Sequence, residues 1–301
     1  MRKKYVYATL ILITLFVTTT FTACYTIDSG DHETPYPVES EDATPSAEET
    51  TPPDDTPEQA LPQEAQVVPT REEIDAKYGN SYPTEWGEAM DGIISILPTN
   101  DKVVAITLDA CGWGAGSGYD EALIDFLVSE NIAATLFISG KWIEDNPGKI
   151  EYLASCDNFE IENHGYLHKP LSINGREQYG IPGTNSVSEV YDEIENNAKR
   201  IEELTGRRSK FFRTGTAYYD DIAIKIAADL GQGIAGYTIA ADGGATFSAQ
   251  QILSVCSNPE NGSILLFHMN HPESGTAAGI KAVYSELTAE GYTFVKMADY
   301  Y

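Results

Sequence analysis

Four of the chain's five histidines fall in two short segments, His164-Gly-Tyr-Leu-His168 and His268-Met-Asn-His271. Each segment directly follows an apolar, strand-like run, and the carboxyl ends of strands are where α/β enzymes keep their reactive groups. The four-residue spacing of His164 and His168 brings both imidazoles to one side of a helical turn, which suits two ligands of one divalent metal. A single histidine would more often cap a helix or fill a core. Because four histidines cluster here, a metal-dependent hydrolase is the first hypothesis. His271, which precedes a proline, is expected to be a loop residue.

Other ionisable side chains follow the remaining strand-like runs of the chain. Asp109, Arg213 and Asp242 each come just after such a run, as His164 and His268 do. The carboxyl ends of the strands in a parallel barrel meet at one rim, so these five side chains should converge there. Asp242 also precedes two glycines, and a role in that turn explains it nearly as well as a role in chemistry.

The elements that must position these residues alternate along the chain. Apolar runs rich in β-branched residues predict strands at 103–108, 133–138, 159–161, 210–212, 233–238, 263–267 and 293–295. Helical spacing of apolar residues predicts helices at 119–131, 187–204, 220–230, 249–256 and 276–290. Strands that alternate with helices predict an α/β fold with a parallel sheet of about seven strands, which right-handed crossovers curl into a barrel or leave open.

The first 24 residues have the pattern of an export signal. A basic start at Met1-Arg2-Lys3-Lys4 is followed by an apolar run to Phe21, and Thr22-Ala23-Cys24 resembles a bacterial lipobox. We therefore expect residues 1–24 to be a lipoprotein-type signal peptide and a lipid on Cys24 to anchor the protein to the membrane. An uncleaved transmembrane anchor is the alternative, because the run approaches the roughly 17 residues that span a bilayer. Either interpretation predicts an extracytoplasmic protein.

Residues 25–72 are predicted to be a disordered acidic tether rich in proline, threonine and serine. No Lys or Arg occurs in 25–70, and such a segment cannot offset the entropy of ordering. Much of the net charge of −27 lies there. Because no basic stripe is available to neutralise phosphates, we expect no nucleic-acid partner. Residues 73–301 are long enough for a single α/β domain with its own core, which we expect to be a monomer.

Five segments of this domain match a known set of motifs in order. They are Thr107-Leu108-Asp109-Ala110-Cys111-Gly112, His164-x-x-x-His168, Phe212-Arg213-Thr214-Gly215, Asp242, and Leu266-Phe267-His268. Over roughly 102–295 the chain resembles the NodB-homology polysaccharide deacetylases of carbohydrate esterase family 4. The resemblance implies a single distorted (β/α) barrel, and removal of N-acetyl groups from an amino-sugar polysaccharide such as peptidoglycan or an N-acetylglucosamine polymer.

The resemblance also implies a divalent metal, zinc by expectation, with cobalt, nickel or manganese as alternatives. His164 and His168 would be two ligands, and a catalytic zinc needs a third. The family's second aspartate, normally a ligand, is replaced by Ala110 or, with one residue inserted, by Cys111. The candidates for the third ligand are therefore Asp109, Asp242, Cys111 and Glu162. Asp109 is favoured because it already lies at the rim, whereas a thiolate would be prone to oxidation outside the cell.

Four residues receive acid and base roles by this resemblance. Asp109 would take a proton from the attacking water, and Arg213 would hold it in its ionised form. His268 would protonate the leaving amine, with Asp242 raising the pKa of its imidazole. Acid and base would thus act from opposite sides of the metal.

The substrate leaves alternatives open. Aromatic side chains in the loops after the strands could stack on sugar rings or be buried against the barrel: Trp113, Tyr166, Tyr218 and Tyr219. Because a fold does not fix a substrate, the domain could also hydrolyse other amides or O-acetyl esters. A third possibility is a non-catalytic glycan-binding lipoprotein, which the missing aspartate motivates.

Overall fold

The computed structural model describes residues 67–112 and 116–301, all within one compact unit, Pro62–Tyr301. The predicted signal peptide, Cys24 and most of the tether lie outside the described residues, as does Trp113. Among the helices of the described ranges, none is both long and apolar enough to cross a membrane.

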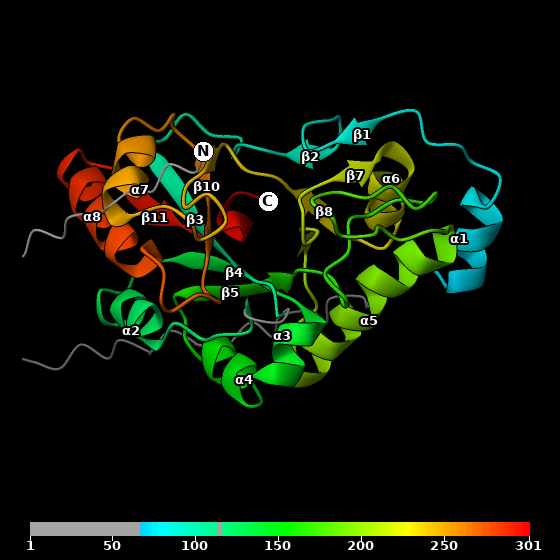
Figure 1. The fold of residues 1–301 in the computed structure, drawn as a ribbon, viewed down its shortest axis with the longest axis horizontal. Coiled ribbons are helices and arrows are strands. Elements are labelled where there is room, and N and C mark those ends of the chain that lie inside the picture. The colour runs from blue at the N-terminus through cyan, green and yellow to red at the C-terminus, as the bar shows by residue number, and fades with distance from the viewer. Residues whose placement is uncertain (1–66, 113–115) are drawn as a thin grey trace, which may run out of the picture. The chain divides into compact units, whose positions relative to one another are not determined.

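The fold is built on a curled parallel sheet (Figure 1). The strands are β1 (Trp86–Gly87), β2 (Ile93–Ile94), β3 (Val103–Ala110), β4 (Ala134–Ile138), β5 (Phe159–Asn163), β6 (Phe211–Phe212), β7 (Tyr219–Asp220), β8 (Gly233–Ala235), β9 (Ile239–Ala240), β10 (Ser263–His268) and β11 (Thr293–Val295). Nine of them form one sheet in the order β2-β8-β6-β5-β4-β3-β10-β9, with β11 paired to β3, and β1 and β7 form a separate antiparallel pair. All pairings in the large sheet are parallel.

One segment connects the two sides of the curled sheet. β8 pairs with β6 and β2 on one side, and β9, three residues further along the chain, pairs with β10 on the other. The segment 233–240 therefore leaves one edge and joins the opposite one, which makes the sheet a distorted barrel. This confirms the predicted fold class.

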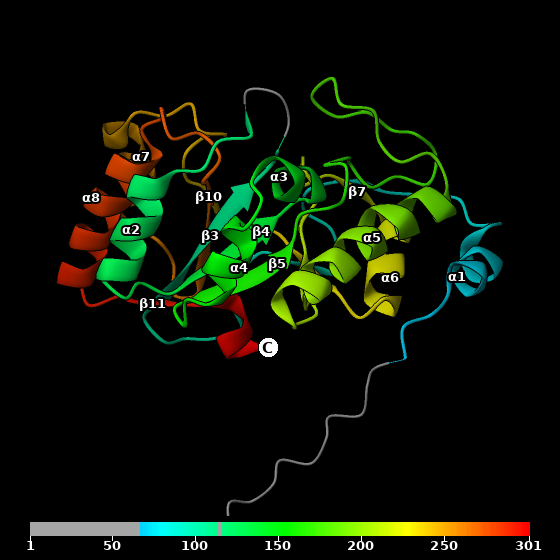
Figure 2. The same ribbon diagram turned by 90° about the horizontal axis from the view of Figure 1, so that it is seen from below.

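Helices cover the outside of the sheet (Figure 2). They are α1 (Arg71–Tyr78), α2 (Glu121–Ser129), α3 (Gly140–Asp145), α4 (Lys149–Ala154), α5 (Val187–Thr205), α6 (Asp221–Asp229), α7 (Ala249–Cys256), α8 (Thr276–Ala289) and a final 3₁₀ turn, η2 (Met297–Tyr300). Side-chain oxygens cap most of the N-termini, as Ser186 does by accepting a hydrogen bond from the backbone N–H of Glu189. α2, α7 and α8 lie on one side of the barrel, and α1, α5 and α6 on the other.

All seven predicted strands and all five predicted helices are present, with small shifts at their ends. The prediction missed the short elements α1, α3, α4, β1, β2, β7, β9 and η2, because pieces of two to eight residues carry little periodicity. α1 begins at Arg71, with Thr70 and Glu73 forming a capping box, so ordered structure starts before the predicted boundary at 73.

The parallel arrangement brings the strand ends together. Asp109 lies near the end of β3, directly opposite His268 at the end of β10. His164 follows β5 and Arg213 follows β6, while Asp242 comes shortly after β9. Because parallel strands share a direction, these residues from five strands lie at one rim of the barrel.

Candidate active site

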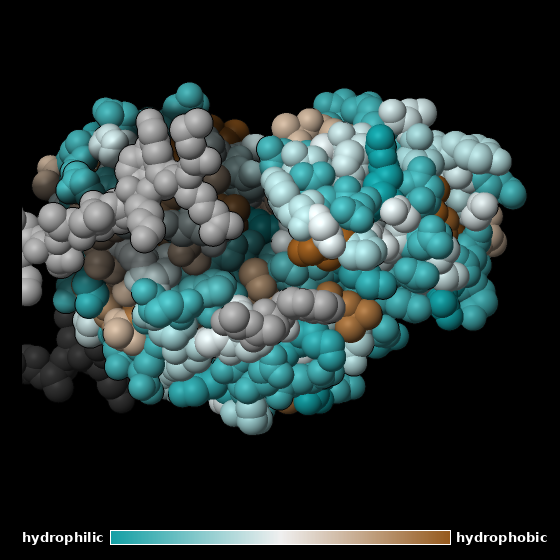
Figure 3. Space-filling view, in the orientation of Figure 1, coloured by the Kyte–Doolittle hydropathy of each residue, from teal (hydrophilic) through white to brown (hydrophobic). Residues whose placement is uncertain are grey.

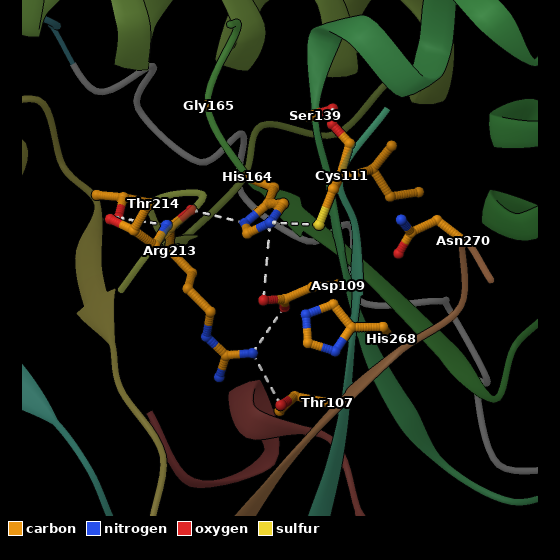
Figure 4. A network of polar contacts seen from close by, with 12 residues as sticks. Thr107, Asp109, Cys111, Ser139, His164, Gly165, Arg213, Thr214, His268 and Asn270 are labelled. Atoms are coloured by element: carbon orange, nitrogen blue, oxygen red, sulfur yellow. Dashed lines mark hydrogen bonds and ion pairs between the residues drawn. The ribbon is translucent and has the colours of Figure 1, made fainter. Parts of the chain in front are cut away.

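A buried ion pair lies at the centre of the rim (Figure 4). Nη1 of the fully buried Arg213 donates to Oδ1 of Asp109 at 2.8 Å. The remaining guanidinium hydrogen bonds go to Oγ1 of Thr107 at 2.9 Å and to the carbonyls of Gly236 and Ala235, at 2.8 and 3.2 Å. With every part of the fork engaged, the guanidinium fixes one carboxylate oxygen of Asp109 and leaves the other facing the rim.

His164 has a defined orientation. Its Nδ1 lies 2.9 Å from the carbonyl oxygen of Arg213, so that nitrogen carries the proton and Nε2 keeps its lone pair. Nε2 is 3.7 Å from Sγ of Cys111 and 3.7 Å from Oδ2 of Asp109. Burial acts to lower the pKa of His164, but the carboxylate of Asp109, the Cys111 thiol and the carbonyl of Arg213 together outweigh it and raise that pKa. These surroundings therefore favour a positive charge at Nε2, whether a proton or a metal ion supplies it.

Three side chains converge as potential metal ligands. Within the described ranges, one group of at least three such residues brings its ligand atoms within 4.8 Å of one another, and it consists of Cys111, His164 and His168. Nε2 of His168 is buried and has no hydrogen-bond partner among the described residues. A thiol and two imidazoles, one of which has an unpartnered buried nitrogen, form a donor set that suits a divalent metal such as zinc.

This set differs from the predicted one in its third member. The sequence favours Asp109, whose Oδ1 is paired with Arg213 and whose Oδ2 lies 3.7 Å from Nε2 of His164, so it adjoins this group without belonging to it. Glu162 accepts a hydrogen bond from the backbone N–H of Phe211 at 2.6 Å. Asp242 is hydrogen-bonded to His268. Burial raises the pKa of the Cys111 thiol, yet the neighbouring imidazoles outweigh it and hold that pKa well below its ordinary value. Of the four candidates weighed, Cys111 is the one grouped with both histidines.

The expected pairing of His268 with Asp242 is present across the rim. Nδ1 of His268 lies 2.9 Å from Oδ1 of Asp242, whose Oδ2 accepts the backbone N–H of His268 at 2.7 Å and Oγ1 of Thr276 at 3.0 Å. Burial would lower the pKa of His268, but the hydrogen bond that its ring donates to Asp242, together with the neighbouring Cys111, outweighs burial and raises that pKa well above its ordinary value. A protonated imidazole held in this way can donate a proton from Nε2. His271 instead contacts Glu273 in the following loop.

Two residues that sequence reasoning missed support the loop between His164 and His168. The buried carboxylate of Glu193 accepts the backbone N–H groups of Leu167 and Lys169 at 3.0 and 3.1 Å. Burial raises the pKa of Glu193 to about 7, although these N–H groups act to lower it. The sequence contains one signal for Glu193: it and Asn197 are polar residues one turn apart on the buried, mostly apolar face of α5.

Gly215 is the second missed residue. A Cβ atom there would lie 2.3 Å from Cγ of His168, so the imidazole packs directly against the glycine backbone. His168 itself has a φ of 59°, in the left-handed region that side chains other than glycine rarely adopt. Backbone strain at this ligand position is therefore held in place by its neighbours on both sides.

A cavity adjoins these groups. It has a volume of ≈ 350 Å³, and Asp109, His268, Thr214, Tyr179 and Tyr237 are among the residues that line it. Figure 3 shows a hollow near the centre of the face presented in that view. A cavity of this size, lined by an acid, a base and aromatic rings, can hold a small polar group such as part of a sugar.

The predicted aromatic residues have different surroundings. Tyr219 is fully buried and accepts the backbone N–H of Thr214, so it cannot stack on a ligand. Tyr218 is partly exposed, and its ring centroid lies 5.8 Å from those of both Trp86 and Tyr179. These three rings form an aromatic group beside the cavity, to which Tyr179 contributes directly.

Comparisons with known proteins show which family the domain resembles. The polysaccharide deacetylase family model matches residues 97–235. The peptidoglycan-N-acetylglucosamine deacetylase PgdA of Listeria monocytogenes is 24% identical over 67% of this chain and 39% of its own length. The peptidoglycan-N-acetylmuramic acid deacetylase PdaA of Bacillus subtilis is 20% identical over 73% of this chain and 81% of its own. The chain spans 30 to 55% of the length of the first three curated relatives that it matches.

Solved structures share the fold. A carbohydrate esterase family 4 pseudoenzyme from Bacillus anthracis superposes with a TM-score of 0.57 and 23% identity, over 69% of this chain and 68% of that one. The matched segment 97–235 contains four of the rim's functional residues, Asp109, His164, His168 and Arg213. The family model and the relatives together identify residues 97–235 as a polysaccharide deacetylase domain, similar to the members of carbohydrate esterase family 4.

Proposed function

We propose that this protein is a metal-dependent hydrolase that removes N-acetyl groups from an amino-sugar polysaccharide of the cell envelope. One observation carries the proposal: Asp109 and His268, each fixed by its own charged partner, line the same cavity beside the group of potential metal ligands. A carboxylate and a raised-pKa imidazole on one cavity are the base and acid that amide hydrolysis needs.

The roles follow from the contacts of each group. A divalent metal held through His164 and His168 would polarise the acetyl carbonyl and lower the pKa of a bound water. Asp109 accepts the proton of the attacking water through the oxygen that Arg213 leaves free. The water oxygen bonds to the acetyl carbon, and His268 then gives its proton to the nitrogen as the carbon–nitrogen bond breaks, which releases acetate and a free amine. Asp242 stabilises the charged form of His268 until that step.

A glycan substrate is supported by the aromatic group beside the cavity. The rings of Trp86, Tyr179 and Tyr218 offer faces of the kind that bind sugar rings, and Tyr179 is 71% exposed. PgdA and PdaA are named for two different peptidoglycan sugars, so we propose peptidoglycan or an exported N-acetylglucosamine polymer as the substrate class.

The envelope location rests on the first part of the chain alone. We propose export through the signal in residues 1–24, a lipid anchor on Cys24 and a tether that lets the domain reach a polymer. By random-coil scaling, a flexible arm of about 40 residues has an average span of several nanometres. These residues lie outside the described part of the structure.

Acetate release tests the function. The purified protein is incubated with N-acetylated peptidoglycan fragments and chito-oligosaccharides, with and without a chelator, beside a His164→Ala, His168→Ala double variant. We expect release that the chelator and the double variant both abolish. Release that survives both would contradict the metal requirement.

Two further outcomes identify the alternatives. The lost aspartate and the likeness in fold to a pseudoenzyme motivate a non-catalytic glycan-binding role, which glycan binding without acetate release would favour. Faster release from O-acetylated xylan than from amides would instead point to an esterase.

A further inference from the structure

We propose that Cys111 is a thiolate ligand of the metal and that, with His164 and His168, it forms a Cys-His₂ site selective for zinc. The inference rests on the proposed metal dependence and goes further by naming the third donor and the metal that it selects. The ligand atoms of these three side chains lie within 4.8 Å of one another, a spacing that a single ion can bridge.

The orientation of His164 presents its lone pair to the sulfur. Because Nδ1 donates to the carbonyl of Arg213, Nε2 has no proton of its own and faces Sγ of Cys111 at 3.7 Å. That distance is long for a direct contact and leaves room for both atoms to approach a shared cation. Metal-bound histidines typically donate their other ring N–H to a carbonyl in this way, which fixes the tautomer.

His168 supplies the independent observation. Its Nε2 is buried without a hydrogen-bond partner among the described residues, although a buried polar atom normally has one. Its ring centroid is 5.0 Å from that of His164, with the rings nearly perpendicular. A cation between the two imidazoles and the thiol would satisfy this nitrogen.

The backbone of Cys111 is held in place for this role. Oγ of Ser139 donates to the carbonyl of Cys111 at 2.6 Å. Gly112 follows with a φ of 67°, and a Cβ there would lie 2.1 Å from the backbone nitrogen of Trp142. The turn after β3 is therefore fixed by close backbone contacts, and the thiol has the preorganised position that a metal ligand needs.

The donor set has consequences for the choice of metal. Thiolate with two imidazoles suits zinc, whereas carboxylate donors suit manganese and magnesium. Three protein ligands also leave one position open for water or substrate, as in catalytic zinc sites. A metal-bound thiolate has its lone pair engaged, which answers the objection that a free one would oxidise outside the cell.

Cobalt(II) substitution tests the proposal directly, because zinc has no absorption of its own and a cobalt–thiolate bond absorbs in the near ultraviolet. The full chain is titrated with cobalt(II), beside Cys111→Ser, Cys111→Asp and, as a matched control, Cys156→Ser. We expect one equivalent of cobalt and a charge-transfer band in the wild type and in Cys156→Ser. The band should be absent from Cys111→Ser and Cys111→Asp, and Cys111→Asp should favour manganese relative to zinc more than the wild type does.

Alkylation provides a second measurement that needs no variant. Iodoacetamide labelling with peptide mapping should modify Cys111 in the metal-free protein, and zinc should slow that labelling at least tenfold, with Cys156 and Cys256 as internal references. Failure of the wild type to bind cobalt, a bound cobalt without the band, a band that persists in Cys111→Ser, or labelling unaffected by zinc would each overturn the proposal. None of these readouts uses turnover, so an inactive protein that gives the band would refute the proposed function while leaving the thiolate ligand in place.

Discussion

The ion pair of Asp109 and Arg213 is the residue-scale feature on which the proposed base depends. Both side chains are almost fully buried, and the guanidinium cannot lose its proton. Replacing the carboxylate therefore has two effects, loss of a base and loss of the counterion of a buried cation.

We predict that Asp109→Asn lowers kcat by about 10²- to 10⁴-fold, the usual contribution of a general base. It should also lower the free energy of unfolding by about 3–5 kcal/mol, because the buried charge of Arg213 loses its counterion. Steady-state kinetics and thermal melts measure the two effects. The control is Asp101→Asn, at an exposed position just before β3, and a near-native kcat in Asp109→Asn would mean that the base lies elsewhere.

The pH dependence belongs to His268. Asp242 raises the pKa of its imidazole, and an acid works only while protonated, so kcat should fall as the pH rises through that raised pKa. We predict that Asp242→Asn lowers the pKa of His268 and moves the alkaline limb of the kcat profile to lower pH, with a lower maximum.

A matched control is available one loop away. His271 and Glu273 make the same kind of contact, 2.9 Å between Nδ1 and Oε1, at an exposed position. Glu273→Gln should leave the alkaline limb where it is in the wild type. If the alkaline limb of the kcat profile stays in place in Asp242→Asn, His268 is not the general acid.

At the scale of elements, helix α5 supports the loop between His164 and His168. Its Glu193 accepts two backbone N–H groups of the segment that carries His168 in a strained conformation. The helix thus holds a loop whose own sequence does not favour its shape.

We predict that Glu193→Gln weakens zinc binding by about 10- to 100-fold, the usual effect of changing a group that supports metal ligands. The amide nitrogen of glutamine would face backbone donors and cannot accept from them. Competition titration with a zinc indicator measures the affinity, and Glu203→Gln, exposed on the same helix, is the control. An unchanged affinity would show that the loop keeps its shape without the carboxylate.

At the scale of the whole molecule, the domain that the structure describes includes α1 in its core. Ile74 and Tyr78 of α1 are buried, and both Lys77 and Tyr78 contact Asp229 of α6. The helix is therefore part of the core although it precedes the family match.

Two truncations follow from this boundary. A chain that begins at Val67 should keep the wild-type kcat on soluble oligosaccharides and the wild-type Tm. A chain that begins at Pro83 should lose on the order of 10 °C in Tm, because two buried side chains of about 2 kcal/mol each are removed from a domain of this size. Calorimetry and acetate release compare the two. A large loss of activity in the chain that begins at Val67 would show that the acidic segment before it is part of the site.

The sequence by itself determined the strands, the main helices and the residues at the rim. Continuous apolar runs such as 103–108 can only be strands buried on both faces, and residues that follow parallel strands must share one edge. The positions of Asp109, His164, Arg213 and His268 therefore follow from local patterns alone.

Only the tertiary structure decided which of these residues touch. The grouping of Cys111 with both histidines depends on contacts between the end of β3 and the loop after β5, and the ion pair of Asp109 with Arg213 joins residues 104 positions apart. The support from Glu193 likewise comes from a helix that no motif includes. Contacts between distant segments depend on strand register and side-chain packing, and spacing along the chain carries no record of either.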